Sequence, residues 1–153
     1  MQNETHFLSE MLYEAIFIPS GEKKLPKEII EEPELNNYIK DFGRKHDYCL
    51  VAKLENELIG AIWIRQFSLN NKGYGFVNEE TPELSMALKP DFRGKGIGKI
   101  MLKEMLTKLV ELKLKQVSLS VDKRNYAYEM YKKNAFIEIE TEKNSVKMLR
   151  KLN

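Results

Sequence analysis

The chain is poor in the residues that cross-link proteins or bind metals. It has one cysteine, Cys49, and two histidines in 153 residues. A single cysteine excludes a disulfide within the chain and favours a reducing compartment. His6 and His46 lie far from each other and from any cluster of ligands at metal-binding spacing. We therefore expect no metal site.

Long apolar runs and a strong charge excess are also absent. No stretch reaches the roughly eighteen apolar residues of a membrane span, and residues 1–20 lack the basic start and apolar block of a signal peptide. We therefore expect a cytoplasmic chain without membrane contact. The 25 lysines and arginines against 23 acids give a charge of +2, which argues against a nucleic-acid partner. The length suits one domain, expected to cover residues 1–153.

Helical periodicity dominates the first part of the chain. Apolar residues at spacings of three and four predict a helix over residues 5–17, which Pro19 and Gly21 end. The charged segment 22–34 predicts a loop with at most a short helix. A second helix is expected over residues 35–42, because the same spacing returns there before Gly43.

The pattern then changes to that of strands. Segments 48–54 and 58–65 predict an antiparallel hairpin, and segment 83–89 alternates. A helix from residue 97 to about 112 leads to a strand at 116–121, which gives a parallel, right-handed crossover. The remaining elements are a short helix near 125–134 and strands at 136–139 and 146–149. We expect an α/β fold with a mixed, mostly antiparallel, twisted sheet and flanking helices.

A glycine-rich loop joins the alternating strand to the long helix. It contains Arg93, Gly94, Lys95, Gly96, Ile97, Gly98 and Lys99. Glycine permits positive φ and lets a ligand approach the backbone. The N-terminus of the following helix adds unpaired N–H groups and the positive end of its dipole, which together favour phosphate. A turn without a ligand is the alternative, but three glycines and three cations exceed what a turn requires.

Two common phosphate motifs do not fit this loop. In a P-loop ending at Gly98 and Lys99, the first glycine would fall on Arg93, and Ile100 would replace the hydroxyl that holds magnesium. A dinucleotide-binding fingerprint would need its third glycine at Lys99. We therefore exclude both.

The spacing Arg-x-x-Gly-x-Gly at Arg93, Gly96 and Gly98 resembles the acyl-CoA signature of the GNAT superfamily of N-acyltransferases. Residues 121–136 resemble the family's later segment, although Asn134-Ala135-Phe136 stands where Gly-Phe is commonest. The resemblance covers residues 50–148 and is most specific over residues 83–136.

The resemblance implies an acetyl-CoA-dependent N-acetyltransferase whose acceptor is an amine. The strands at 83–89 and 116–121 would splay apart to form the cleft for direct attack. The family usually begins with a strand before its first helix, and only residues 1–4 could supply it here. We expect that strand to be missing or vestigial.

The resemblance also implies the residues that hold acetyl-CoA. The pyrophosphate would bind the backbone of the glycine loop, and the pantetheine arm would pair with the strand at Met86, Ala87 and Leu88. Asn125 would hydrogen-bond the same arm, and it could also cap the following helix.

Two side chains match catalytic positions. Tyr131 matches the family's general acid, although it could be a core tyrosine, and Tyr126 and Tyr128 are rivals. Glu83 stands where many members carry a base that acts through water, although an exposed strand residue would give the same pattern. A backbone N–H near Met86 or Ala87 could stabilise the oxyanion.

The acceptor is not specified by these residues. The N-terminal helices and the loop at 67–82 should line its side of the cleft, with Tyr13, Glu14, Trp63, Tyr74 and Phe76, although these aromatic residues could equally fill the core. A second class of function also fits: an acyl-CoA-binding sensor or interaction module without turnover. A homodimer formed through the exposed last strand is a further expectation.

Overall fold

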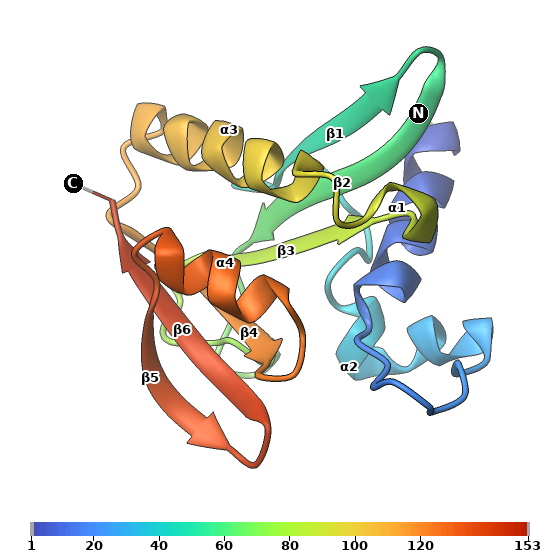
Figure 1. Cartoon of the computed structure of the whole chain (residues 1–153). Helices are drawn as coiled ribbons and strands as arrows, with labels where there is room; N and C mark the ends of the chain where they lie inside the picture. The colour runs from blue at the N-terminus through green and yellow to red at the C-terminus, as the bar shows by residue number, and fades with distance from the viewer. Residues whose placement is uncertain (1, 153) are drawn as a thin grey trace.

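A six-stranded sheet runs through the molecule and carries helices on both faces (Figure 1). The computed structural model describes residues 2–152, and of residues 2–5 the backbone alone. None of the helices in this range combines the length and apolar content that a membrane crossing requires. In chain order, the elements are α1 (Gln2–Ala15), η1 (Lys27–Glu31), α2 (Pro33–Asn36), β1 (Tyr48–Leu54), β2 (Glu57–Arg65), β3 (Glu83–Leu88), η2 (Pro90–Phe92), α3 (Ile97–Glu111), β4 (Gln116–Asp122), α4 (Ala127–Lys133), β5 (Ile137–Glu142) and β6 (Ser145–Lys151).

The strand order confirms the predicted mixed sheet. It is β1-β2-β3-β4-β6-β5, and only the β3–β4 pair is parallel. That pair shares a single bridge, between Glu83 and Ser118, beside a hydrogen bond of 3.0 Å from the Ser118 N–H to the Pro82 carbonyl. Figure 1 shows the two strands diverging beyond this point. The expected splay is therefore present, and it begins at Glu83.

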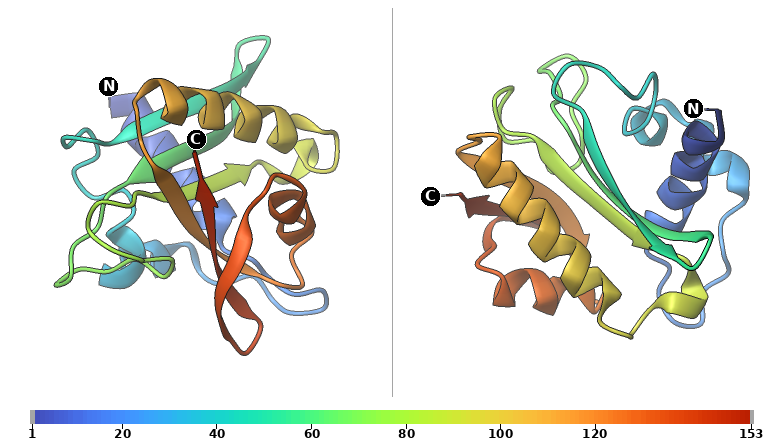
Figure 2. Two further views of the ribbon diagram at one scale, coloured as in Figure 1. Left: turned by 90° about the vertical axis from the view of Figure 1, so that its left-hand side faces the viewer. Right: turned by 90° about the horizontal axis from the view of Figure 1, so that it is seen from above.

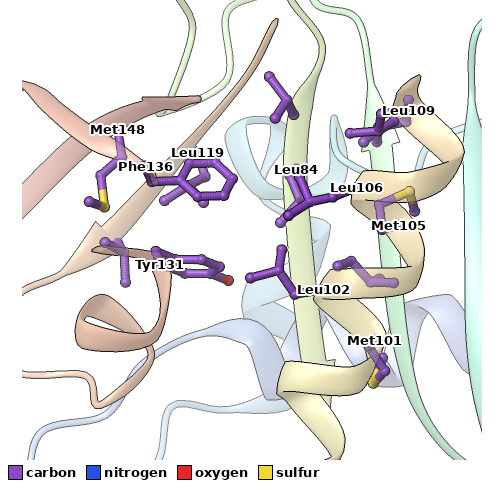
Figure 3. Packing of buried hydrophobic residues seen from close by; sticks show 14 of the residues in the cluster. Leu84, Met101, Leu102, Met105, Leu106, Leu109, Leu119, Tyr131, Phe136 and Met148 are labelled. Carbon is purple, nitrogen blue, oxygen red and sulfur yellow. The ribbon is translucent and has the colours of Figure 1, made fainter. Parts of the chain in front are cut away.

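Two apolar layers cover the sheet. Leu84 and Leu88 of β3 pack with α3 and α4, in a cluster that includes Leu102 and Tyr131 (Figure 3). Ala87 faces the other way and joins the cluster formed with α1. Figure 2 shows α1 and α3 on opposite sides of the sheet. Because side chains alternate along a strand, successive β3 residues face different helices.

The helix expected over residues 35–42 is wrong in extent. The α-helix α2 ends at Asn36, and turns follow. The carbonyls of Asn37 and Lys40 accept hydrogen bonds from the buried Arg65 guanidinium, at 2.9 and 2.7 Å. Arg65 also forms a bidentate pair with the buried Asp47. These tertiary bonds satisfy carbonyls that a continuing helix would have used, so the chain turns instead.

The two edges of the sheet agree with one expectation and correct another. Residues 2–4, available for an additional first strand, are helical, and Met1 lies outside the described residues. Within the described chain, β1 is therefore one edge of the sheet. The last strand, β6, is paired on both sides, by β4 and β5. It cannot form the edge-to-edge dimer we expected, because its backbone groups are already used; β5 is the second edge.

Candidate active site

The glycine loop places open space where side chains would otherwise project. Gly94 and Gly96 have φ values of 73° and 84°. A Cβ atom added to either residue would meet nothing within 4 Å. Gly98, in the first turn of α3, packs near the Met86 side chain instead. The backbone of residues 94–96 is therefore accessible to a ligand and is held in a conformation that favours glycine.

The same loop carries a row of unused donors. Within residues 2–152, no backbone N–H from Gly94 to Lys99 donates a hydrogen bond. The first bond at this end of α3 runs from the Ile100 N–H to the Gly96 carbonyl, at 3.3 Å. These consecutive donors surround the positive end of a helix of 15 residues. Such an arrangement favours an anion with several oxygens.

Arg93 has a different role from the glycines. Its Nε donates to the Leu88 carbonyl at 3.1 Å, and its Nη2 donates to the Glu14 carboxylate at 2.8 Å. The guanidinium thus ties the loop to the end of β3 and to α1. Lys95 lies over the Phe92 ring, 5.8 Å from its centroid. Arg93, one of the three cations predicted to favour phosphate, is therefore hydrogen-bonded to other parts of the protein.

The backbone of β3 presents alternate residues to the cleft. The Lys89 N–H donates to the Ile59 carbonyl of β2 at 2.8 Å, next to the Gly60–Leu88 pair. In an antiparallel ladder, hydrogen-bonded pairs alternate with pairs that are not hydrogen-bonded. Ala87 therefore bonds to Ala61 of β2, whereas the backbone groups of Met86 and Leu88 point away from β2. The Leu88 carbonyl accepts from Arg93. The Met86 N–H and carbonyl therefore face the space left by the divergence of β4.

A cleft of about 880 Å³ occupies this space. It lies between the diverging strands and is closed by the end of α1, the segment after it, and α4. The cleft brings together predicted residues that are far apart in the sequence: Glu83, Met86, Ala87, Leu88, Arg93, Asn125 and Tyr131. Residues 94–99 do not line it; they follow Arg93, which lies at its wall. Trp63 and Phe76, expected near the acceptor, are buried in the cluster with α1.

Glu83 is buried, which rules out the exposed-residue alternative. Its side chain has two hydrogen bonds: Oε2 accepts from the Tyr38 hydroxyl, and Oε1 accepts from the Gly75 N–H at 2.9 Å. Burial raises the pKa of Glu83 to about 7, while the bonds from Tyr38 and Gly75 and the charge of Lys147 oppose that rise. A carboxyl group with this pKa can exchange a proton near neutral pH.

Tyr38 is a candidate site residue that the sequence did not reveal, because it lines the cleft beside Glu83. Tyr38 lies at one of the apolar positions that predict a helix over residues 35–42, and no local signal distinguishes it from the others. Its hydroxyl donates to Glu83 and accepts from the Tyr74 N–H at 2.7 Å, and its ring stacks on Tyr74 at 6.3 Å. Burial and the adjacent Glu83 raise the pKa of Tyr38, so the phenol remains a donor.

The loop of residues 67–82 passes close to Glu83, and this approach requires glycine at positions 73 and 75. A Cβ at Gly73 would collide with the Glu83 carboxylate and lie 2.9 Å from the Tyr38 hydroxyl. A Cβ at Gly75 would lie 2.7 Å from the carbonyl carbon of Leu119. Glycine at these positions lets the backbone approach closely enough for the Gly75 N–H to reach Glu83.

Tyr131 projects from α4 into the boundary between the cleft and the core. Its ring packs edge-to-face with Phe136, and Figure 3 shows its hydroxyl directed away from α4 toward the side of Leu102. Burial raises the pKa of Tyr131, so the phenol stays protonated at neutral pH. The hydroxyl donates to no residue in the described chain. A protonated phenol at the cleft wall is thus available to a ligand.

The two rival tyrosines are placed differently. Tyr126 is 61% exposed at the mouth of the cleft. Tyr128 does not line the cleft, and its hydroxyl donates to Glu138 at 2.6 Å. Neither shares the buried position of Tyr131.

Asn125 lies at the start of α4 and lines the cleft. Its Oδ1 accepts from the Ala127 N–H at 3.0 Å, so it caps the start of α4. Its Nδ2 donates to no described residue, and the side chain lines the cleft. Capping therefore leaves a donor available. Across residues 2–152, no three histidine, cysteine or carboxylate side chains are grouped so that they could hold a metal ion.

Comparison with known proteins agrees with this geometry. A search of curated proteins found no significant match. Among solved structures, the chain resembles PaiA N-acetyltransferase of Thermoplasma acidophilum in complex with coenzyme A, with 21% identity over 97% of this chain and 93% of that one and a TM-score of 0.67. The ribosomal-protein-alanine N-acetyltransferase of Brucella melitensis is 19% identical, over 99% and 96%, with a TM-score of 0.68.

A third similar structure is YncA of Salmonella typhimurium, a putative acetyltransferase with its cofactor acetyl-CoA. It is 13% identical, over 100% of this chain and 91% of that one, with a TM-score of 0.68. At such identities these likenesses concern the fold. The model of the acetyltransferase (GNAT) family matches residues 10–136, which include the glycine loop, the cleft and α4. The chain therefore belongs to the GNAT family of acetyltransferases.

Proposed function

We propose that the protein transfers an acetyl group from acetyl-CoA to a primary amine. The observation that carries this proposal is that two sets of unused backbone groups, on the glycine loop and on β3, lie next to each other. The open N–H row from Gly94 to Lys99 follows the free edge of β3, which leads to a cleft lined by Glu83 and Tyr131. The similar structures that hold coenzyme A and acetyl-CoA support this use of the site.

Acetyl-CoA fits the donors and spaces present. The N–H groups of residues 94–99 would bind its pyrophosphate, in the space that side chains at Gly94 and Gly96 would fill. The pantetheine amides would pair with the Met86 carbonyl and the Leu88 N–H as an added strand, which leaves the Met86 N–H for the thioester oxygen. Asn125 Nδ2 would donate to a carbonyl of the same arm. Ala87 would contribute less, because its backbone is bonded to β2.

Each group then has one chemical task. A neutral amine attacks the thioester carbonyl carbon, so that a C–N bond forms and the C–S bond breaks. Glu83 removes the amine proton through a water molecule, and each of its oxygens keeps a lone pair that can accept from that water. The Met86 N–H stabilises the developing oxyanion. Tyr131 donates its proton to the departing sulfur.

The test is release of free thiol from acetyl-CoA in the presence of a panel of amines, with mass spectrometry of the acetylated product. Amine-dependent thiol release with an equal amount of amide formed supports acetyl transfer. If calorimetry shows that acetyl-CoA binds but no amine in the panel causes thiol release, the protein would instead be an acyl-CoA sensor. A reaction without amine measures background hydrolysis.

A further inference from the structure

The part of the cleft that would hold the acceptor lies on a different face of β3 from the part that would hold acetyl-CoA. Glu83 and Ala87 alternate along β3 with Leu84 and Met86, which belong to the layer with α3. The face of Glu83 is therefore the face of α1 and of the segment that follows it. An amine that loses its proton toward Glu83 lies on this side.

The wall of this part of the cleft consists mainly of apolar and aromatic side chains. It is formed by Phe17 and Ile18 after α1, by Leu25, Ile29 and Leu35 of the next segments, and by the stacked rings of Tyr38 and Tyr74. The Tyr13 hydroxyl donates to the Leu25 carbonyl at 2.5 Å, which fastens the segment after α1 to the helix. The Arg124 guanidinium lies over the Phe17 ring at 5.8 Å. The wall is thus fastened at two points.

Four carboxylates of the described residues line the cleft, and two of them are committed to ion pairs. Glu14 pairs with Arg93 at 2.8 Å, and Asp122 pairs with Arg124 at 2.8 Å. Glu22 is exposed at the rim. Among the residues that the structure describes, only Glu83 is both buried in the cleft and without a cationic partner in contact. A second ammonium group on the acceptor would therefore meet no uncommitted carboxylate inside the cleft.

An anionic acceptor is disfavoured for a related reason. Its charge would lie near Glu83, and the cations at the cleft are paired or exposed: Arg93 is paired with Glu14, and Lys24 is exposed. A buried charge without a partner is costly. We therefore infer, on the basis of the proposed acetyl transfer, that the acceptor is a primary monoamine attached to an apolar aliphatic or aromatic body.

The inference is tested with acetyl-CoA and five amines: 2-phenylethylamine, hexylamine, spermidine, alanine and a tripeptide with a free N-terminus. The kcat/KM of one of the two apolar monoamines should exceed that of the other three by about tenfold or more. A higher kcat/KM for spermidine, alanine or the peptide would overturn the inference while leaving acetyl transfer intact. Absence of thiol release with every amine would overturn both.

A variant locates the preference. Leu25 is 41% exposed, so Leu25→Glu should fold, and its backbone bond to Tyr13 is retained. We expect its kcat/KM to fall about fivefold for the apolar amines and to rise for spermidine, with an unchanged KM for acetyl-CoA. The matched control is Leu112→Glu, because Leu112 is 46% exposed and lies outside the cleft. An equal effect of both substitutions would contradict the assignment of this wall to the acceptor.

Discussion

The two ends of the proposed active site are built in opposite ways. At the glycine loop, the binding groups are N–H donors of consecutive residues, open to solvent and free of intramolecular bonds. At Glu83, the groups come from three separate segments and are buried and mutually hydrogen-bonded. The first end therefore depends on local backbone conformation, and the second on packing. Substitutions at the loop should remove binding, whereas substitutions around Glu83 should change the rate and its pH dependence.

The largest effect is expected from Gly96→Val, which tests the loop. Valine is strained at a φ of 84°, and its side chain would fill the space assigned to pyrophosphate. We expect calorimetry to detect no binding of CoA. Gly43→Val is the matched control, because Gly43 also has positive φ and open space but lies outside the glycine loop. Normal binding by Gly96→Val would contradict the backbone site.

Tyr131→Phe tests the proposed acid without changing the loop. Loss of the phenol proton should lower kcat by a few hundredfold, within the range of about 10² to 10⁴ for a general acid. The affinity for acetyl-CoA should remain near that of the wild type. Tyr128→Phe is the control, since the Tyr128 hydroxyl bonds to Glu138 outside the cleft. Equal turnover in Tyr131→Phe and wild type would remove the assignment.

Glu83→Gln tests the buried end and should lower kcat/KM by about a hundredfold at pH 8. A base must be ionised to act, so wild-type activity should rise with pH through the Glu83 pKa of about 7. The variant should lack this rise, because glutamine does not titrate. The check is a pH profile of both proteins from 5.5 to 9, a range of about three to four pH units around that value. An identical rise in both would assign the titration to another group.

The smallest effect is expected from Tyr38→Phe, which removes one bond from the Glu83 network. The Tyr38 hydrogen bond lowers the pKa of Glu83, so its loss should move the rise in activity to higher pH. At pH 7 we expect a loss of about three- to fivefold, recovered near pH 9. Tyr48→Phe, outside the cleft, should leave the profile unchanged. A loss that is equal at every pH would indicate that Tyr38 does not act through Glu83.

Much of the fold could be predicted because its signals are local. The alternation at 83–89 and the helical spacing after Ile97 each follow from side-chain periodicity, and the crossover between them follows from chain handedness. The turn after Asn36 could not be predicted in this way. It depends on Arg65, which is remote in sequence and takes up the carbonyls of residues 37 and 40.

The candidate site likewise has one part that local sequence predicts and one part that depends on tertiary contacts. The sequence alone determined the glycine loop, because a run of residues that permits positive φ before a helix exposes its N–H groups wherever it occurs. Only the tertiary structure decided that Glu83 is buried and that Tyr38 and Gly75 hold it. A proton affinity depends on every group brought near the carboxylate, and those groups come from segments that only folding places together.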